Sequence, residues 1–159
     1  MQERRPRIYC CGVFDLCHLG HMEFFKKLHM HGDVVVGVHN NNDVMSYKRK
    51  PYMDMETRVE TVKHIKYVVE VIPHAPLITT CEFMRQHNLD IIGIPEEYIP
   101  EELRNYPPVK MAHVIRNKKY VTTYYDEPIS ENMFVIIPRF DGISTTDIVN
   151  EIVNRHSFL

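Results

Sequence analysis

The sequence lacks three features that would each indicate a particular class of protein. Its uninterrupted apolar stretches are short, as at residues 34–36, whereas a membrane-spanning helix needs about 20 apolar residues. The charged residues at its start are followed by no apolar segment, so we expect no secretory signal. There is no basic excess either, because 19 Lys and Arg stand against 21 Asp and Glu. A nucleic-acid-binding protein needs a basic face for the phosphates, so we expect no nucleic acid as partner. The short apolar stretches predict no membrane segment in this chain.

The sequence has four cysteines, and their placement does not indicate disulfides. Cys10 and Cys11 are adjacent, which is a poor arrangement for a disulfide framework, so we expect a reduced, cytoplasmic protein. Five potential metal ligands fall within twelve residues: Cys10, Cys11, Cys17, His18 and His21. They include no CxxC pair, and no second Cys/His pair lies at zinc-site spacing. We therefore expect buried thiols and no bound metal.

The composition is that of one globular domain. The chain has 159 residues, of which 44% are hydrophobic and 25% charged, proportions that are ordinary for a soluble protein and argue against disorder. A chain of this length builds a single core, and no internal repeat divides it. We therefore expect one domain over residues 1–159.

Strand-like and helix-like apolar patterns alternate along the chain. We expect strands at residues 8–13, 33–38, 67–72, 91–94 and 134–137. We expect helices at residues 21–31, 55–65, 79–87, 109–117 and 145–155, and an irregular loop over the proline-rich residues 95–110. Strict alternation predicts an α/β fold, a Rossmann-like doubly wound parallel sheet of about five strands with helices on both faces. Ligands of such sheets bind beyond the carboxyl ends of the strands.

The turn after the first strand, GVFDLCHLGH at residues 12–21, carries the strongest functional signal. Gly12 allows a nucleotide to approach the backbone closely, and Gly20 leaves the first N–H groups of the next helix open to an anion. His18 and His21 are three residues apart at the start of that helix, so both imidazoles can face one point. Two imidazoles there can bind phosphate oxygens and stabilise the charge that builds up during phosphoryl or nucleotidyl transfer.

A second candidate site lies at the last strand–helix connection, residues 138–147. The groups suited to phosphate there belong to Arg139, Ser144, Thr145 and Thr146. Alone, this pattern is typical of an ordinary helix cap. Together with the first turn it predicts a cradle for a polyphosphate at one edge of the sheet. Cations of the Lys48–Pro51 run, and Arg58 on the following helix, could reach the same phosphates.

These two motifs resemble the signatures of the cytidylyltransferase family, within the HxGH nucleotidyltransferases. Residues 12–21 match the first signature of the family, and residues 139–147, RFDGISTTD, resemble the second, usually written RTEGISTTD. The resemblance covers most of residues 7–155, and residues 74–80 are similar to the ethanolamine-phosphate branch in particular. Either signature alone is weak, but the two together are specific.

The resemblance implies a nucleotidyl transfer. CTP would bind in the cradle with Mg²⁺ carried on its phosphates, and a phosphomonoester such as phosphoethanolamine or phosphocholine would attack the α-phosphorus and release pyrophosphate. By family position the catalytic residues are His18, His21, Lys48 and Arg139. The nucleotide-binding residues are Gly12, Val13, Phe14, Asp15, Gly20, Gly142, Ile143, Ser144, Thr145 and Thr146, with Arg58 and Glu96 as further candidates. The family also implies a homodimer.

The sequence departs from the family pattern at several positions. Cys11 stands where the family usually has Asp, and residues 93–97, GIPEE, replace the usual HGDD. Leu77 stands where choline enzymes carry an aromatic residue suited to a quaternary ammonium. Two enzymatic alternatives are therefore kept, a glycerol-3-phosphate cytidylyltransferase and an adenylyltransferase. A third alternative is a catalytically inactive, nucleotide-binding regulatory protein.

Overall fold

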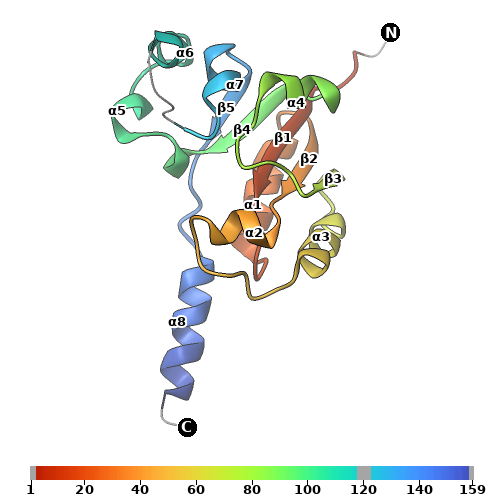
Figure 1. Ribbon diagram of the computed structural model, residues 1–159, viewed down its shortest axis with the longest axis vertical. Helices are drawn as coiled ribbons and strands as arrows, with labels where there is room; N and C mark the ends of the chain where they lie inside the picture. The colour runs from red at the N-terminus through yellow and green to blue at the C-terminus, as the bar shows by residue number, and fades with distance from the viewer. Residues whose placement is uncertain (1–2, 118–122, 158–159) are drawn as a thin grey trace.

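Five parallel strands form one sheet (Figure 1). The computed structural model describes residues 3–117 and 123–157. The strands are β1 (Arg7–Gly12), β2 (Asp33–Val38), β3 (Val68–Pro73), β4 (Ile91–Pro95) and β5 (Phe134–Ile137). Their order in the sheet is β3-β2-β1-β4-β5, and every neighbouring pair is parallel. The predicted five-stranded α/β sheet is confirmed, with each strand within one residue of its expected bounds.

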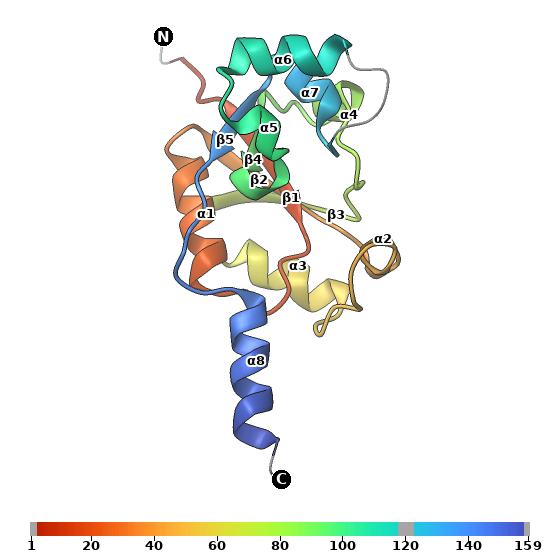
Figure 2. The same cartoon turned by 90° about the vertical axis from the view of Figure 1, so that its left-hand side faces the viewer.

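Helices cover both faces of the sheet, as Figures 1 and 2 show from two sides. The helices are α1 (Leu19–His29), α2 (Asn41–Met45), α3 (Met55–Lys63), α4 (Cys81–Gln86), α5 (Glu101–Arg104), α6 (Pro108–Asn117), α7 (Asp126–Ser130) and α8 (Thr145–His156), with a 3-10 turn at Glu96–Tyr98. Helices α1 and α3 pack in one apolar core, and α4 to α7 pack in the other. Successive residues of β1 alternate between the two: Ile8 and Cys10 face the first core and Tyr9 the second.

The segment between β4 and α6 corrects one expectation. Residues 95–110 were expected to be an irregular loop, but they hold the 3-10 turn, α5 and the start of α6. Two of the prolines stand where helices begin and do not interrupt a helix. Pro100 precedes α5, and Pro108 is the first residue of α6. Proline is well tolerated at these positions because the first N–H groups of a helix have no partner within it.

Helix α8 differs from all the other helices described here in extending away from the sheet (Figures 1 and 2). None of its residues is buried, and Ile152 and Val153 are exposed. In the part of the chain that the structure describes, no helix has the length and apolarity needed to cross a bilayer.

The strand order places a ligand site next to β1. The chain builds β2 and β3 on one side of β1 and then crosses to place β4 and β5 on the other. The connections that leave β1 and β4 therefore diverge at their carboxyl ends, and a crevice opens between them. Both predicted motifs follow strands at this edge of the sheet, the first after β1 and the second after β5.

Candidate active site

A cavity of about 590 Å³ lies at the carboxyl edge of the sheet. It is formed by the turn between β1 and α1, the loop after α2, the end of β4 and the connection from β5 to α8. The predicted site residues that line it are His18, His21, Lys48, Arg139, Gly12, Val13, Phe14, Asp15, Gly20, Ile143, Ser144, Thr145 and Thr146. The fold therefore gathers most of the predicted residues around one space.

The imidazoles of His18 and His21 accept hydrogen bonds from backbone N–H groups at the start of α1. Nδ1 of His18 accepts a hydrogen bond from the N–H of Gly20 at 3.0 Å, and Nδ1 of His21 accepts one from the N–H of His18 at 3.2 Å. A ring nitrogen that accepts a hydrogen bond carries no proton, so each neutral imidazole carries its proton on Nε2. The ring centroids lie 4.1 Å apart. The pair therefore offers the cavity two neighbouring Nε2–H donors.

Both imidazoles are neutral at pH 7. The pKa of His21 is lowered to about 4, chiefly by burial and then by the adjacent His18, while the carboxylate of Asp15 opposes both. Burial also lowers the pKa of His18, and the carboxylate of Asp147 opposes that change. Neutral donors suit a site where anionic charge develops, because they stabilise it through hydrogen bonds already in position.

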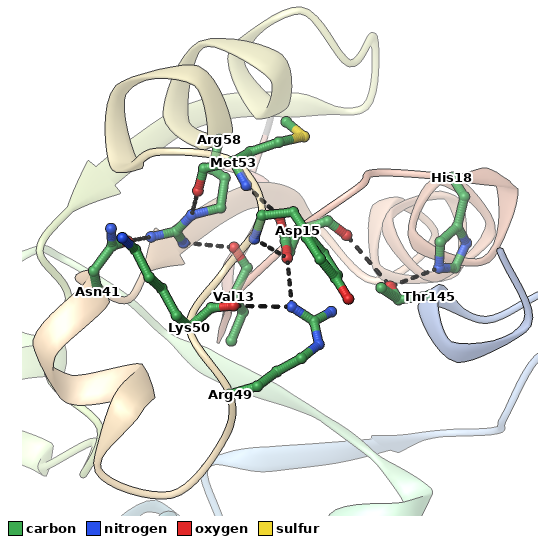
Figure 3. A network of polar contacts seen from close by, with 10 residues as sticks. Val13, Asp15, His18, Asn41, Arg49, Lys50, Met53, Arg58 and Thr145 are labelled. Carbon is green, nitrogen blue, oxygen red and sulfur yellow. Dashed lines mark hydrogen bonds and ion pairs between the residues drawn. The ribbon is translucent and has the colours of Figure 1, made fainter. Parts of the chain in front are cut away.

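The two predicted motifs meet beside His18 (Figure 3). The hydroxyl of Thr145, the first residue of α8, donates to the carbonyl oxygen of Asp15 at 3.3 Å, and Nε2 of His18 lies 3.4 Å from the same hydroxyl. The backbones also come close: a Cβ added to Gly20 would lie 2.8 Å from the carbonyl oxygen of Ile143. Glycine at position 20 therefore permits the contact between the amino ends of α1 and α8.

The amino end of α8 leaves backbone N–H donors without acceptors inside the helix. The hydroxyl of Ser144 accepts from the N–H of Asp147 at 3.1 Å, and the carboxylate of Asp147 accepts from the N–H of Ser144 at 2.9 Å. The N–H groups of Thr145 and Thr146 belong to the first turn, where no carbonyl within the helix can accept from them. Both threonines line the cavity, and N–H groups at such a position suit an anion.

The first turn itself is tightly shaped. Phe14 and Leu16 both have positive φ angles, of 52° and 47°. A Cβ on Gly12 would lie 3.1 Å from the ring of Phe14, so Gly12 makes room for that ring as well as for a ligand. Such left-handed backbone in bulky residues is strained and is concentrated at functional sites.

The charges around the cavity favour an anion. The cationic side chains that line it are Lys27, Lys48, Arg49 and Arg139. The acidic ones are Asp15 and Glu97, and Asp15 is buried against its own partners. A cavity with excess positive charge, two helix N-termini and neutral imidazole donors is suited to bind a polyphosphate.

Comparison with known proteins decides the family. The sequence profile of the family described as Cytidylyltransferase-like matches residues 9–151. The chain belongs to this family. It is 30% identical, over 95% of its length, to ethanolamine-phosphate cytidylyltransferase of Mus musculus. It is 33% identical, over 97% of its length, to choline-phosphate cytidylyltransferase of Saccharomyces cerevisiae.

The chain spans about a third of each of these relatives, 33% of the mouse protein and 33% of the yeast protein. A crystal structure of the lipopolysaccharide core biosynthesis protein from Thermoplasma volcanium shares the fold, with a TM-score of 0.59 at 21% identity. That likeness covers 86% of this chain and 98% of the archaeal one. It shows the fold alone.

In this member of the cytidylyltransferase-like family, Arg58 does not reach the cavity. It is fully buried, and its guanidinium donates to the carbonyl oxygens of Val13 at 2.7 Å and Met53 at 3.2 Å (Figure 3). It also donates to the carbonyl oxygen of His39 at 3.0 Å. These bonds join the first turn, the end of β2 and the chain before α3. Arg58 supports the site from within the core, and the expectation that it could contact phosphates is not met.

Gly142 and Glu96 also lie outside the cavity lining. A Cβ on Gly142 would meet the ring of Phe140, so this glycine makes room for a neighbouring side chain. The carboxylate of Glu96 accepts from the backbone N–H of Arg139 at 3.4 Å. It therefore helps to hold the β5–α8 connection, while the next residue, Glu97, is the one that faces the cavity.

Asp15 lines the cavity, but its carboxylate accepts hydrogen bonds from the neighbouring loop. It accepts from the N–H groups of Tyr52 at 2.8 Å and Met53 at 2.9 Å, and from Arg49 at 3.2 Å. Burial alone would raise the pKa of Asp15, but these donors together lower it below its ordinary value. Asp15 thus fastens the chain that carries Lys48 to the first turn.

Sequence reasoning did not single out two polar residues that line the cavity, Lys27 and Tyr98, and it included Arg49 only as one cation of the Lys48–Pro51 run. Arg49 had a signal, since it stands inside the basic run beside Lys48. Lys27 lies on α1, two turns beyond His18, and its ammonium donates to the carbonyl oxygen of Pro138 at 3.0 Å. That contact depends on the tertiary approach of β5 to α1, which no local pattern reveals.

Proposed function

We propose that this chain is a catalytic domain that transfers CMP from CTP to a small phosphomonoester, phosphoethanolamine or phosphocholine, for phospholipid synthesis. The products are a CDP-alcohol and pyrophosphate. One observation carries the proposal: the amino ends of α1 and α8, with the Nε2–H groups of His18 and His21, converge on a single cationic cavity. The names of the mouse and yeast relatives support CTP as the nucleotide.

The proposed reaction is an in-line displacement at phosphorus. An oxygen of the acceptor phosphate donates an electron pair to the α-phosphorus of CTP and forms a new P–O bond. The bond from the α-phosphorus to the bridging oxygen breaks, and pyrophosphate leaves with that electron pair. No protein nucleophile is required, so the chain contributes positioning and charge stabilisation.

Each group around the cavity has a role in that displacement. His18 and His21 donate through Nε2 to phosphate oxygens on which charge accumulates. Arg139 and the first N–H groups of α8 hold the phosphates that leave, and Lys48 contacts the attacking phosphate. Removal of one such preorganised donor costs about 10²–10³ in kcat in other enzymes.

We propose that Mg²⁺ arrives as part of the nucleotide. Hard cations prefer oxygen ligands, which the triphosphate supplies. Residues 3–117 and 123–157 contain no group of three or more His, Cys, Asp or Glu side chains placed to hold a metal ion. The ion would neutralise charge on the departing pyrophosphate.

The experiment is a pyrophosphate-release assay that crosses two nucleotides with three acceptors. CTP and ATP are each combined with phosphoethanolamine, phosphocholine and glycerol 3-phosphate. We expect release with CTP and one of the first two acceptors. Preference for ATP would make the chain an adenylyltransferase, and preference for glycerol 3-phosphate would assign the other cytidylyltransferase branch. CTP binding by calorimetry without any release would instead indicate a regulatory, nucleotide-binding protein.

We also propose that the protein works as a cytoplasmic homodimer. All four cysteines are free thiols, as a reducing compartment requires. The apolar side chains Ile152 and Val153 of α8 are exposed and would be covered by a second subunit. Sedimentation velocity tests the assembly: a dimer that Ile152→Asp and Val153→Asp together convert to a monomer is expected, and a monomeric wild type would contradict it.

A further inference from the structure

Arg49 lines the cavity, and its guanidinium is held in place on two sides (Figure 3). Nη1 donates to the carboxylate of Asp15 at 3.2 Å and to the carbonyl oxygen of Lys50 at 3.1 Å. The guanidinium carbon lies 4.0 Å from the centre of the Tyr52 ring, within the range of a cation–π contact. A long side chain fixed in this way has already lost the conformational freedom that binding a ligand would otherwise cost.

Asp15 connects Arg49 to the imidazole pair. Its carboxylate accepts from Arg49, while its backbone carbonyl accepts from the hydroxyl of Thr145, which lies 3.4 Å from Nε2 of His18. The position of Arg49 is therefore set relative to the proposed reaction centre through one intervening residue. A cation on a loop without this connection would have no fixed position relative to the imidazoles.

Most donors of Arg49 are unused by the protein. In residues 3–117 and 123–157, no acceptor is paired with Nε or Nη2 of its guanidinium. The side chain is about half exposed, 47%, whereas its partner Asp15 is buried at 6%. Asp15 also accepts two backbone N–H groups, so its charge does not depend on Arg49 alone. The guanidinium can bind an anion without first leaving the carboxylate.

The sheet order indicates which phosphate Arg49 would meet. The connection that carries Arg139 and α8 follows β5, and the loop that carries Lys48 and Arg49 follows β2; β1 and β4 lie between them. In an in-line displacement the attacking and leaving oxygens lie on opposite sides of phosphorus. If α8 holds the leaving pyrophosphate, the attacking group enters from the side of Arg49.

We propose that Arg49 binds the phosphate of the acceptor, with Asp15 and Tyr52 as the residues that position its guanidinium. The planar fork of arginine suits a phosphate monoester, which presents several oxygens at once. This assignment rests on the proposed function for the identity of the acceptor, and on the geometry of the cavity for the binding of its phosphate.

Arg49→Ala and Arg49→Lys test the assignment by steady-state kinetics. We expect Arg49→Ala to raise the KM for the acceptor at least tenfold, since hydrogen bonds to charged groups are strong, and to leave the KM for CTP within about twofold. Arg49→Lys keeps the charge without the fork and is expected to recover part of the loss. Lys50→Ala is the matched control, because Lys50 is the neighbouring cation and does not line the cavity.

Three results would overturn the proposal: an unchanged acceptor KM in Arg49→Ala, equal rises in the KM for CTP and for the acceptor, or the same effect in Lys50→Ala. The second would mean that Arg49 serves only to fold the loop. A thermal melt of each variant checks that the fold survives; if Arg49→Ala unfolds, Arg49→Lys and Arg49→Gln give the same comparison.

A second measurement separates this proposal from the reaction itself. Calorimetry with inorganic phosphate as the probe is carried out on the wild type and on Arg49→Ala in the absence of nucleotide. We expect affinity for phosphate to fall at least tenfold in the variant. If the wild type releases no pyrophosphate from any nucleotide, the proposed function fails, while this titration still supports or refutes anion binding by Arg49.

Discussion

The amino ends of α1 and α8 are capped by the same pattern of hydrogen bonds, but they present different groups to the cavity. In each, the first capping residue and the residue three positions later exchange hydrogen bonds with the turn: His18 with His21 in α1, and Ser144 with Asp147 in α8. An imidazole has a second nitrogen, so the cap of α1 leaves two Nε2–H donors. The cap of α8 leaves the backbone N–H groups of its first turn, since the hydroxyl of Thr145 already donates to the carbonyl oxygen of Asp15.

The two helices also differ in how firmly they are held. Helix α1 buries Phe25 and Leu28 in a core of the sheet, whereas α8 buries no side chain. Groups that stabilise a transition state must keep their positions, which favours the packed helix for the imidazoles. The α8 end is fixed mainly by its contacts with the first turn, through Thr145 and the approach of Ile143 to Gly20.

Removing the imidazole donors gives the largest expected effect. His18→Asn and His21→Asn each keep an oxygen near the position of Nδ1, so the caps survive, but lose the Nε2–H group. Because each donor stabilises developing charge in the transition state, we expect kcat for pyrophosphate release to fall about 10²–10³-fold in either variant, with a smaller change in the KM for CTP. Steady-state assays at saturating acceptor measure both.

Ser144→Ala is the corresponding change in α8. It removes the hydroxyl that accepts from the N–H of Asp147 and weakens the cap by about 1 kcal/mol, but leaves in place the imidazole donors and the first N–H groups of α8. We expect kcat to stay within about tenfold of the wild type. Equal losses in Ser144→Ala and His18→Asn would show that the two caps matter in the same way and would remove the distinction between the helices.

Gly20→Ala tests the contact between the helices themselves. The new methyl group would lie 2.8 Å from the carbonyl oxygen of Ile143 and 2.7 Å from Cε1 of His18, so one of the two must move. Displacement of catalytic groups by about 1 Å can cost about 10²-fold in rate. We expect a loss of about tenfold to a hundredfold in kcat/KM, measured by pyrophosphate release.

Gly142→Ala provides the comparison for that variant. Its methyl group would meet the side-chain ring of Phe140, which can rotate, rather than a backbone oxygen. We expect a smaller loss than in Gly20→Ala. If Gly20→Ala keeps the activity of the wild type, the close approach of the two helix ends is not needed for the reaction.

The part of the site that the sequence predicted is the part with a local signature. The strands were identified by short apolar runs and the two motifs by glycines, histidines and hydroxyl residues at helix starts. The five-residue helices α2 and α7 were missed because neither spans enough turns to show a helical period. Arg58 was misassigned because its buried bonds to Val13 and His39 join segments far apart in the sequence.

The smallest expected effect concerns stability and pH. The pKa of His21 is lowered to about 4 in the folded protein, and the pKa values of His18 and His39 are lowered as well, each chiefly by burial. A histidine in the unfolded chain has a pKa near 6.5. Below that pH these histidines therefore bind protons in the unfolded state but stay neutral in the folded state. The contribution of these neutral histidines to the free energy of unfolding is therefore fully present above about pH 6.5. It decreases as the pH falls toward 4.

Urea unfolding between pH 7 and about 5.5 measures the first part of this decrease, before most ordinary carboxylates take up protons. His21→Asn removes the most strongly shifted imidazole and is expected to flatten the curve in that window. His31→Asn, which changes an exposed histidine beyond α1, should superpose on the wild type. If His21→Asn retains the full slope of the free energy of unfolding against pH, burial of the α1 imidazoles is not what keeps them neutral. The packing of α1 would then not explain why its imidazoles are neutral donors, and this difference between α1 and α8 would be removed.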